Sequence, residues 1–152
     1  MSFDTRNGTR GARQPGRSRL ERWGNQRMVE SIRRKGTRRG DKVALVTIGK
    51  RTGLERMTPV RCFLEDDGTR LIVASADGAP RNPSWYYNLA ANPDRVRIEF
   101  AGQRIEVTPE QLHGAERDAA WQRITARASG FARYERITDR QIPVIRLTPT
   151  VR

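Results

Sequence analysis

The sequence has little of the side-chain chemistry on which many enzymes depend. Among its 152 residues there is one cysteine, Cys62, and one histidine, His113. An intrachain disulfide needs two cysteines, and zinc sites of the usual type need more cysteine and histidine ligands than the chain offers. A serine or cysteine nucleophile would depend on His113, which the pattern places on the surface. We therefore predict no metal site and expect a bound cofactor to carry any reaction.

Long apolar runs are also missing. Hydrophobic residues make up 36% of the chain and charged residues 31%, and each apolar run is short and interrupted by charge. A membrane-spanning helix needs about 18 or more apolar residues, so we expect no transmembrane segment. The arginine-rich start lacks the apolar stretch of a secretory signal, and we expect a cytoplasmic protein.

Positive charge is abundant and unevenly placed. Lysine and arginine number 30 against 17 for aspartate and glutamate, and residues 1–40 hold 12 basic and 3 acidic residues. The composition of residues 1–19 predicts a disordered arm, and residues 20–35 predict an amphipathic helix. Its apolar row consists of Leu20, Gly24, Met28 and Ile32. We favour packing of this row on the domain, while the alternative is a helix at the inner face of the cell membrane.

Residues 41–152 predict one domain of short strands. Alternating or β-branched runs bounded by turn residues predict strands at 43–48, 57–64, 70–75, 96–100, 105–107 and 141–147. Two helices interrupt them. Residues 84–91 predict one, with Asn82 as N-cap and Pro83 at its first position. Thr108, Pro109 and Gln111 predict the start of another, and 126–139 is expected to be irregular. This order indicates an α+β fold built on a small, mostly antiparallel barrel.

The first candidate site is the loop 49–56. Its glycines allow backbone N–H groups to approach an anion, and Lys50, Arg51, Arg56 and the hydroxyl of Thr52 can pair with anionic oxygens. The spacing is not that of a Walker loop. The alternative is an ordinary solvated hairpin loop.

The second candidate site is the segment 82–89. A helix N-terminus offers free N–H groups and a positive dipole end, and Trp85 offers a flat wall for a heterocycle. The alternative is simple packing of the helix on the barrel. Ser75, at a strand end, and Tyr134 could each donate a hydrogen bond to a substrate oxygen.

Three motifs in order resemble the deazaflavin-dependent nitroreductase family. Gly49-Lys50-Arg51-Thr52-Gly53 with Arg56 and Pro59 is similar to its G-[RK]-[KR]-[ST]-G-x-x-R-x-x-P motif. Asn82-Pro83-Ser84-Trp85-Tyr86-Tyr87-Asn88-Leu89 with Asn92-Pro93 is similar to its N-P-x-W-Y-x-N-L and N-P segment. Thr138-Asp139-Arg140 with Ile142-Pro143-Val144 is similar to its T-D-R-x-I-P-V motif.

The resemblance implies a split β-barrel of the FMN-binding-protein type that binds coenzyme F420, a deazaflavin whose tail carries a phosphate and glutamates. It implies hydride transfer to a quinone, nitro compound or enone. The coenzyme-binding residues that it implies are Lys50, Arg51, Thr52, Gly53, Arg56, Met57, Thr58, Pro59, Val73, Ala74, Ser75, Ala76, Ser84, Trp85, Tyr86, Tyr87 and Asn88.

On the acceptor side the resemblance implies catalytic roles for Tyr134 and Ser75 and a pocket formed by Arg61, Phe131 and Tyr134. Some relatives have tyrosine where this chain has Arg61 and Phe131, so the acceptor pocket is expected to differ. We therefore do not transfer reduction of nitroimidazoles to this chain.

Two other interpretations are kept. The same barrel type can bind FMN, which would make the protein a flavin oxidoreductase. Alternatively, residues 1–40 could make it a non-catalytic module for a membrane or, less favoured, for nucleic acid. If the tail binds a polyanion, we expect residues 1–40 to act separately from the coenzyme site, so their deletion would abolish polyanion binding and spare coenzyme binding. The oligomeric state, monomer or dimer, stays open.

Overall fold

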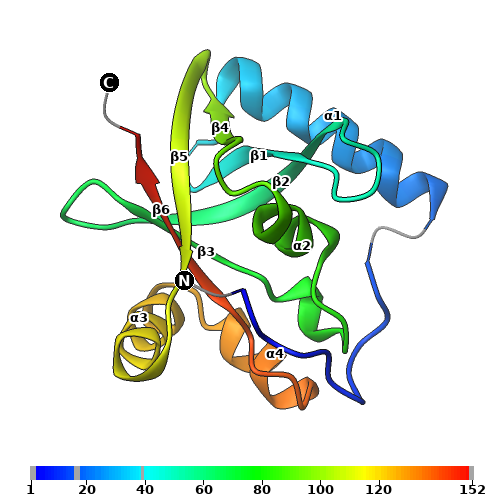
Figure 1. Ribbon diagram of the computed structural model, residues 1–152, viewed down its shortest axis with the longest axis vertical. Coiled ribbons are helices and arrows are strands. Elements are labelled where there is room, and N and C mark those ends of the chain that lie inside the picture. Colours follow the sequence, from blue (N-terminus) through cyan, green and yellow to red (C-terminus); the bar gives the residue numbers. More distant parts are fainter. Residues whose placement is uncertain (1–2, 16–17, 39, 151–152) are drawn as a thin grey trace.

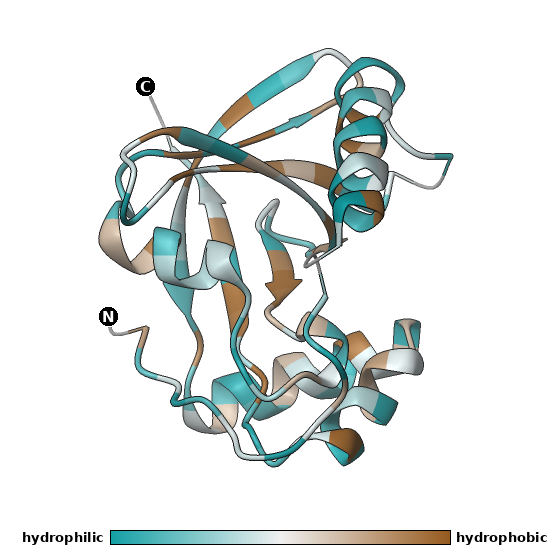
Figure 2. Cartoon of the chain, turned by 90° about the vertical axis from the view of Figure 1, so that its right-hand side faces the viewer, coloured by the Kyte–Doolittle hydropathy of each residue, from teal (hydrophilic) through white to brown (hydrophobic). Residues whose placement is uncertain are grey.

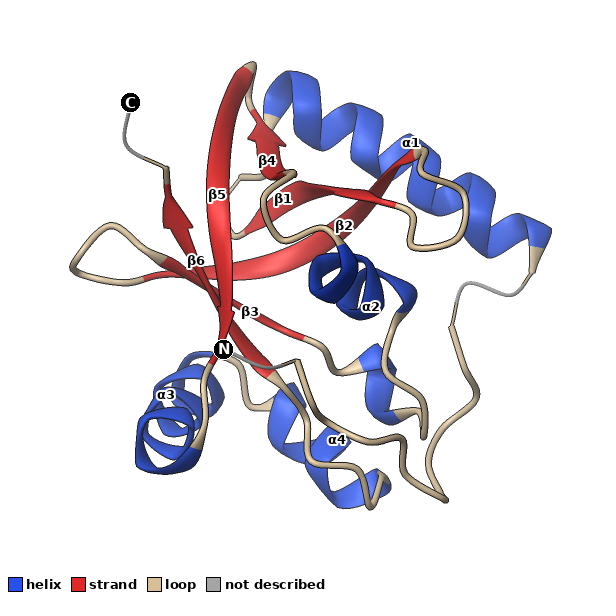
Figure 3. Cartoon of the chain, viewed as in Figure 1, coloured by secondary structure: helices blue, strands red, loops and turns tan. Residues whose placement is uncertain are grey.

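Six strands close into a barrel, and the helices lie on its outside (Figure 1) (Figure 3). The computed structural model describes residues 3–15, 18–38 and 40–150. The elements are α1 (Arg19–Lys35), β1 (Lys42–Ile48), β2 (Glu55–Leu64), β3 (Arg70–Val73), the 3-10 turn η1 (Ala76–Gly78), α2 (Ser84–Ala91), β4 (Val96–Phe100), β5 (Gln103–Gln111), α3 (Gly114–Arg127), α4 (Gly130–Ile137) and β6 (Val144–Pro149). The strand order is β1-β2-β3-β6-β5-β4, and each pairing is antiparallel. The predicted antiparallel barrel is confirmed.

The β4–β5 hairpin shows how sequence pattern produces this barrel. Val96 and Ile98 are buried, so the alternation along β4 turns one face to the barrel interior. Ala101 and Gly102 form the two-residue turn with φ of 49° and 78°. Positive φ at both positions is the geometry that matches the twist of paired strands.

Helix α1 packs on the barrel. Its buried side chains are Val29 and Ile32. The turn N–H groups of Ala101 and Gly102 donate to the carbonyls of Ile32 and Arg33 at 2.9 and 2.7 Å. These bonds satisfy carbonyls that the end of a helix would otherwise leave unpaired. The favoured packing of this helix is therefore confirmed.

The predicted apolar row of α1 is only partly right. Ile32 is buried, but Leu20 is 75% exposed and Met28 is 41% exposed. Val29 occupies the buried face instead. Helix α1 lies at one end of the molecule and the pair α3 and α4 lies at the other, as Figure 1 and Figure 2 both show.

The predicted helix start at Pro109 is wrong. Strand β5 continues to Gln111, and Pro109 lies opposite Leu147 of β6. Val107, Pro109 and Gln111 are buried while Thr108 is exposed, so the period-two alternation runs through the segment. Cross-strand pairing with β6 therefore overrides the local capping pattern.

The following helices also differ from the prediction. Helix α3 begins at Gly114, with His113 as N-cap, and turns Ala120, Trp121 and Ile124 inward. Most of the segment 126–139, predicted to be irregular, is helical, because α3 ends at Arg127 and α4 follows.

The arm predicted to be disordered is packed over residues 3–15. Phe3 contacts the ring of Tyr86 edge-on, with ring centres 5.7 Å apart, and the N–H of Thr5 donates to the Tyr86 hydroxyl at 3.0 Å. Composition missed this because long-range hydrogen bonds, and not apolar burial alone, hold the segment. Among the helices in the described ranges, none is long and apolar enough to cross a bilayer.

Candidate functional site

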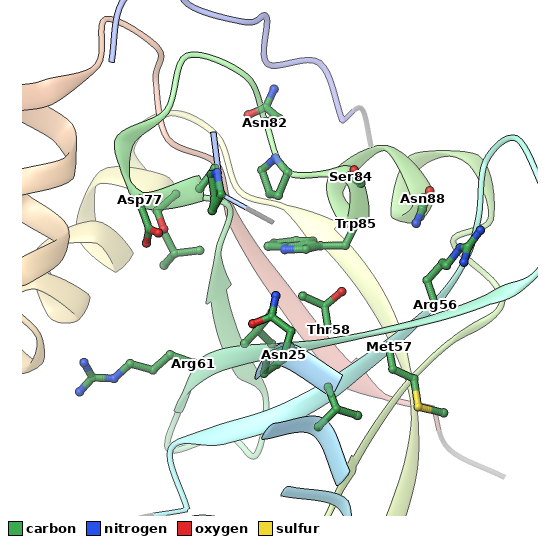
Figure 4. Close-up of a pocket in the computed structure, with 18 of the residues that line it drawn as sticks. Asn25, Arg56, Met57, Thr58, Arg61, Asp77, Asn82, Ser84, Trp85 and Asn88 are labelled. Atoms are coloured by element: carbon green, nitrogen blue, oxygen red, sulfur yellow. The ribbon is translucent and has the colours of Figure 1, made fainter. Parts of the chain in front are cut away.

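A cleft of about 1810 Å³ opens between α1, β2, the loop after β3, the start of α2, and α4. Figure 4 shows the indole of Trp85 projecting from α2 above Thr58 of β2. The predicted site residues that line the cleft are Lys50, Arg51, Thr52, Arg56, Met57, Thr58, Pro59, Arg61, Val73, Ser75, Ala76, Ser84, Trp85, Tyr87, Asn88, Phe131 and Tyr134. One cavity thus gathers segments that are far apart in sequence.

Three predicted coenzyme residues do not line this cleft. Gly53 lies at the exposed turn of the basic loop with φ of 69°. Ala74 is fully buried, and Tyr86 is 1% exposed within the barrel core. The Tyr86 hydroxyl donates to Gln111 Oε1 at 2.6 Å, which fixes the ring inside the protein. The structure therefore gives Tyr86 a packing role.

The side chain of Asn88 holds the basic loop in place. Asn88 of α2 accepts a hydrogen bond from the N–H of Lys50 at 2.9 Å, and its Nδ2 donates to Thr47 Oγ1 at 3.2 Å. The loop is thereby tied to α2 and β1. Asn88 lines the cleft, but both ends of its amide are engaged within the protein.

The hydroxyl of Thr52 is turned into the loop. Its Oγ1 accepts from the N–H of Leu54 at 3.3 Å and from Arg56 Nη2 at 3.5 Å. A side chain at position 49 would bring its Cβ to 2.5 Å from this oxygen, so glycine is required there. Because Oγ1 accepts twice, its proton remains available to donate to a bound anion.

The cations of the loop are not neutralised by neighbouring carboxylates. In the described part of the chain, Lys50, Arg51 and Arg56 form no ion pair. Glu55 pairs with Arg97 through hydrogen bonds of 2.7 and 3.2 Å, and these bonds lower the pKa of Glu55. The loop therefore presents uncompensated positive charge to the cleft.

The start of α2 is open to a ligand. The N-cap is Pro83, and no side chain caps the helix. Asn82, predicted to be the cap, uses its amide elsewhere: Nδ2 donates to the Thr5 carbonyl at 3.0 Å, and Oδ1 accepts from Arg140 at 2.7 Å. The prediction is wrong because a buried guanidinium competes for this oxygen. The positive end of the helix dipole faces the cleft beside Ser84.

Two hydroxyl donors, Ser75 and Tyr134, line the cleft together with the acceptor carboxylate of Asp77. Burial, followed by interaction with the Asp77 carboxylate, raises the pKa of Tyr134 above its ordinary value of 10.0. The phenol is thus protonated at neutral pH. Phe131 packs edge-on against Tyr134, with ring centres 5.7 Å apart.

Arg61 lies at the edge of this region. Figure 4 shows its guanidinium pointing away from Trp85. The group is 5.4 Å from the ring centre of Phe63, and Nε is 3.6 Å from Asp41. The Phe63 ring in turn packs edge-on against Phe131. Arg61 therefore borders the predicted acceptor pocket through aromatic packing.

Some residues of the site were not predicted. Asn25 and Val29 of α1 line the cleft, although this helix was assigned to the tail. Asn25 is exposed and lies four residues before the buried Val29, so the spacing i, i+4 and i+7 of Asn25, Val29 and Ile32 was a usable signal for the side of the helix that faces the barrel. Asp77 carried no local signal, because Tyr134 is distant from it in sequence. Arg140 appeared within the third motif, but no role was predicted for it, because the carbonyls it binds are distant in sequence.

The chain matches the F420H(2)-dependent quinone reductase family over residues 18–149. It is 40% identical over 107 residues to "F420H(2)-dependent quinone reductase Rv1261c" of Mycobacterium tuberculosis (strain ATCC 25618 / H37Rv), covering 68% of this chain and 70% of that protein. The structure of an F420-H2 dependent reductase, FDR-A, is 33% identical with a TM-score of 0.62, covering 70% of this chain and 93% of that chain.

Other solved structures share the fold. One described as a domain-swapped dimer is 32% identical with a TM-score of 0.63, over 83% of this chain and 95% of that one. A pyridoxamine 5'-phosphate oxidase-like protein of Listeria innocua is 10% identical with a TM-score of 0.51, over 73% and 85%, which supports the split-barrel fold alone. With the family match covering most of the sequence, the chain belongs to the F420H(2)-dependent quinone reductase family.

Proposed function

We propose that this protein holds reduced coenzyme F420 in the cleft and reduces a quinone there. The observation that carries the proposal is the unpaired cationic loop on one wall of a cleft whose other walls bear an uncapped helix start and a flat indole. The bound coenzyme would supply a hydride, so no protein nucleophile is needed. This agrees with a chain that has one cysteine, buried at position 62.

The residues of the cleft fit this coenzyme. Lys50, Arg51 and Arg56 offer the charge needed by a tail of phosphate and glutamates, and the Thr52 hydroxyl adds a donor. The N–H groups at the start of α2 suit a polar ring edge, while Trp85, which is 7% exposed and packs in the barrel core, reaches the cleft and can contact the ring there. Anion-binding and ring-binding features thus lie on one continuous surface.

The phenol of Tyr134 is placed to serve the acceptor. A quinone that takes up a hydride needs one proton to become the hydroquinone. The raised pKa keeps Tyr134 protonated, so it can donate a hydrogen bond and then a proton to the acceptor oxygen. Ser75 offers a second hydroxyl in the same part of the cleft.

The proposal is tested by mixing the protein with reduced F420 and separate quinone, nitroaromatic and enone acceptors. Oxidation of the reduced coenzyme is followed by its absorbance. We expect oxidation with quinones. A titration with FMN runs beside it, because tight FMN binding without F420 binding would overturn the proposal, as would failure to oxidise the coenzyme with any quinone.

We also propose that the outer face of α1 contacts an anionic lipid surface, which would bring the cleft near lipid-soluble quinones. Leu20 and Trp23 are 75% and 55% exposed. The guanidinium of Arg27 lies 5.0 Å from the Trp23 ring centre, so cationic and apolar groups share this face. Arg34 and Lys35 are exposed further along the helix. This combination is typical of interfacial helices.

Sedimentation with vesicles containing anionic phospholipid tests this contact. Wild-type protein is expected to sediment with the vesicles at low salt, and the double substitution Leu20→Ala with Trp23→Ala should release it. Leu64→Ala, an exposed leucine elsewhere on the barrel at 56%, is the matched control. Equal sedimentation of the double variant and the control would rule out this face.

A further inference from the structure

Residues 4–14, called the strap here, lie along the loop 74–82 that forms one wall of the cleft. The N–H of Gly8 donates to the Pro80 carbonyl at 2.7 Å, and the N–H of Ala12 donates to the Gly78 carbonyl at 3.0 Å. Figure 1 shows this dark blue segment passing beside α4 and the turn after β3. The strap precedes residues 18–149, which match the family, so it is a feature of this chain outside that match.

The loop depends on outside partners because most of it lies outside helices and strands. Arg140, 3% exposed, donates to the carbonyls of Ala74 at 2.8 Å, Ser75 at 2.7 Å and Ala79 at 3.1 Å. The strap supplies donors to carbonyls that Arg140 does not reach. Buried backbone carbonyls need such partners, so the position of the loop depends on both.

The side chain of Asp139 binds the strap through three hydrogen bonds. This carboxylate accepts from the N–H groups of Thr9 at 2.7 Å and Arg10 at 3.1 Å, and from the Thr9 hydroxyl. The Thr9 hydroxyl bond, followed by the two backbone bonds, lowers the pKa of Asp139 to about 2, so the anchor stays ionised above that pH. At Gly11 an added Cβ would collide with the Gly78 carbonyl, so the close approach requires glycine.

Asn7 connects the strap to the cationic end of the cleft. Its Oδ1 accepts from the Tyr87 hydroxyl at 2.8 Å and from the N–H of Asn82 at 3.2 Å. The ammonium of Lys50 lies 5.9 Å from the ring centre of Tyr87. Asn7, Tyr87 and Lys50 all line the cleft. Asn7 thus orients the ring against which a coenzyme-binding cation rests.

We propose that the strap is part of the coenzyme site: Asn7 is a positioning residue that acts through Tyr87, and strap docking and coenzyme binding strengthen each other. The inference rests on the proposed binding of F420 in this cleft. It reverses the expectation that residues 1–40 act separately from the coenzyme. Coupling is reciprocal, so the coenzyme must stabilise the docked strap as much as the strap stabilises the coenzyme.

A double-mutant cycle measures the link between Asn7 and Tyr87. Asn7→Ala and Tyr87→Phe both remove the hydrogen bond between these residues, and Asn7→Ala also removes the bond from the Asn82 N–H, so Tyr87→Phe is expected to raise the dissociation constant for oxidised F420 about fivefold and Asn7→Ala at least as much. The double variant should show about the same rise in the dissociation constant as Asn7→Ala alone, and the effect on the reaction should appear in the KM for the coenzyme rather than in kcat. Asn92→Ala, at the other end of α2, is the matched control and should bind normally. Additive losses, or no loss, would overturn the link.

Trypsin reports strap docking without any reaction. The Arg10–Gly11 bond lies in the strap, and the Arg10 carbonyl accepts from Thr138 Oγ1 at 2.9 Å. Saturating oxidised F420 should slow cleavage after Arg10 about fivefold or more in the wild type. Gly11→Ala should speed cleavage and weaken coenzyme binding. Gly24→Ala, where an added Cβ meets nothing within 4 Å, should change neither.

The outcomes separate the two proposals. If wild-type protein does not bind F420, the proposed function fails. If it binds F420 while Gly11→Ala binds equally well and the coenzyme gives no protection from trypsin, the proposed function stands and the role of the strap is disproved.

Discussion

Replacing both Lys50 and Arg56 with alanine is expected to raise the dissociation constant for coenzyme F420 by about 100-fold or more. Hydrogen bonds from charged groups contribute about 1.5–3 kcal/mol each, and neither cation has a carboxylate partner to release on substitution in the described part of the chain. Turnover at saturating coenzyme should change little, because these side chains come from the β1–β2 connection and the start of β2, whereas the proposed proton donor Tyr134 comes from α4. Fluorescence titration with oxidised F420 measures the affinity.

The control for this experiment is Arg95→Ala, which removes an exposed arginine outside the cleft lining. It lowers the net charge by one but should leave the affinity unchanged. The wild-type affinity should fall with added salt, and the double variant should show a shallower dependence because it has fewer cations to screen. A loss in Arg95→Ala about half that of the double variant, on a logarithmic scale of affinity, would mean that only overall charge matters, because the control removes one charge and the double variant removes two.

Tyr134→Phe is expected to lower turnover with a quinone about 100-fold and to leave the affinity for coenzyme F420 unchanged. General acid catalysis contributes about 10²- to 10⁴-fold, and phenylalanine keeps the ring packing against Phe131 while removing the proton donor. Steady-state rates at saturating coenzyme measure this effect. Tyr87→Phe is the matched control, because it should lower affinity and keep turnover. A Tyr134→Phe enzyme with full turnover would remove the phenol from the mechanism.

The pH dependence gives a second test of the same residue. The pKa of Tyr134 is raised, so the phenol keeps its proton through neutral pH and loses it only above the ordinary value of 10.0. Turnover that depends on this proton should therefore stay flat to about pH 10 and fall beyond it. Asp77→Asn removes the negative charge beside the phenol, so the fall should move to lower pH. Asparagine tolerates the positive φ of 55° at this position.

Local patterns predicted the parts of the site that are continuous in sequence. The helix 84–91 lies where it was predicted, because short helices are encoded by nearby residues. The loop that follows β1 also lies where its glycines place it, but it is shorter than the predicted 49–56, because β2 begins at Glu55 and Arg56 pairs with Thr47 of β1. The motif resemblance added the coenzyme, which residue spacing alone left open between phosphate, carboxylate and simple solvation. The roles of individual side chains in binding remain predictions.

Tertiary contacts overrode local patterns elsewhere. The capping pattern at Thr108 and Pro109 predicts a helix, but these residues belong to strand β5. They pair with Thr148 and Leu147 of β6, and this pairing helps to close the barrel. Asn82 caps no helix, because Arg140 takes its side-chain oxygen. In both places a hydrogen-bonding partner that is distant in sequence replaces the local capping hydrogen bond that the pattern predicted.

The sequence by itself determined the shortage of nucleophilic and metal-binding side chains, the concentration of positive charge and the cationic loop that we propose to bind the coenzyme. Only the tertiary structure decided that residues 3–15 pack beside the cleft, that α1 supplies Asn25 to it, and that burial, followed by the nearby Asp77, raises the pKa of Tyr134. The physical reason is the range of the interactions. Composition, turns and alternation act between neighbours, whereas the hydrogen bonds of Asn7, Arg140 and Asp139 join segments more than 50 residues apart.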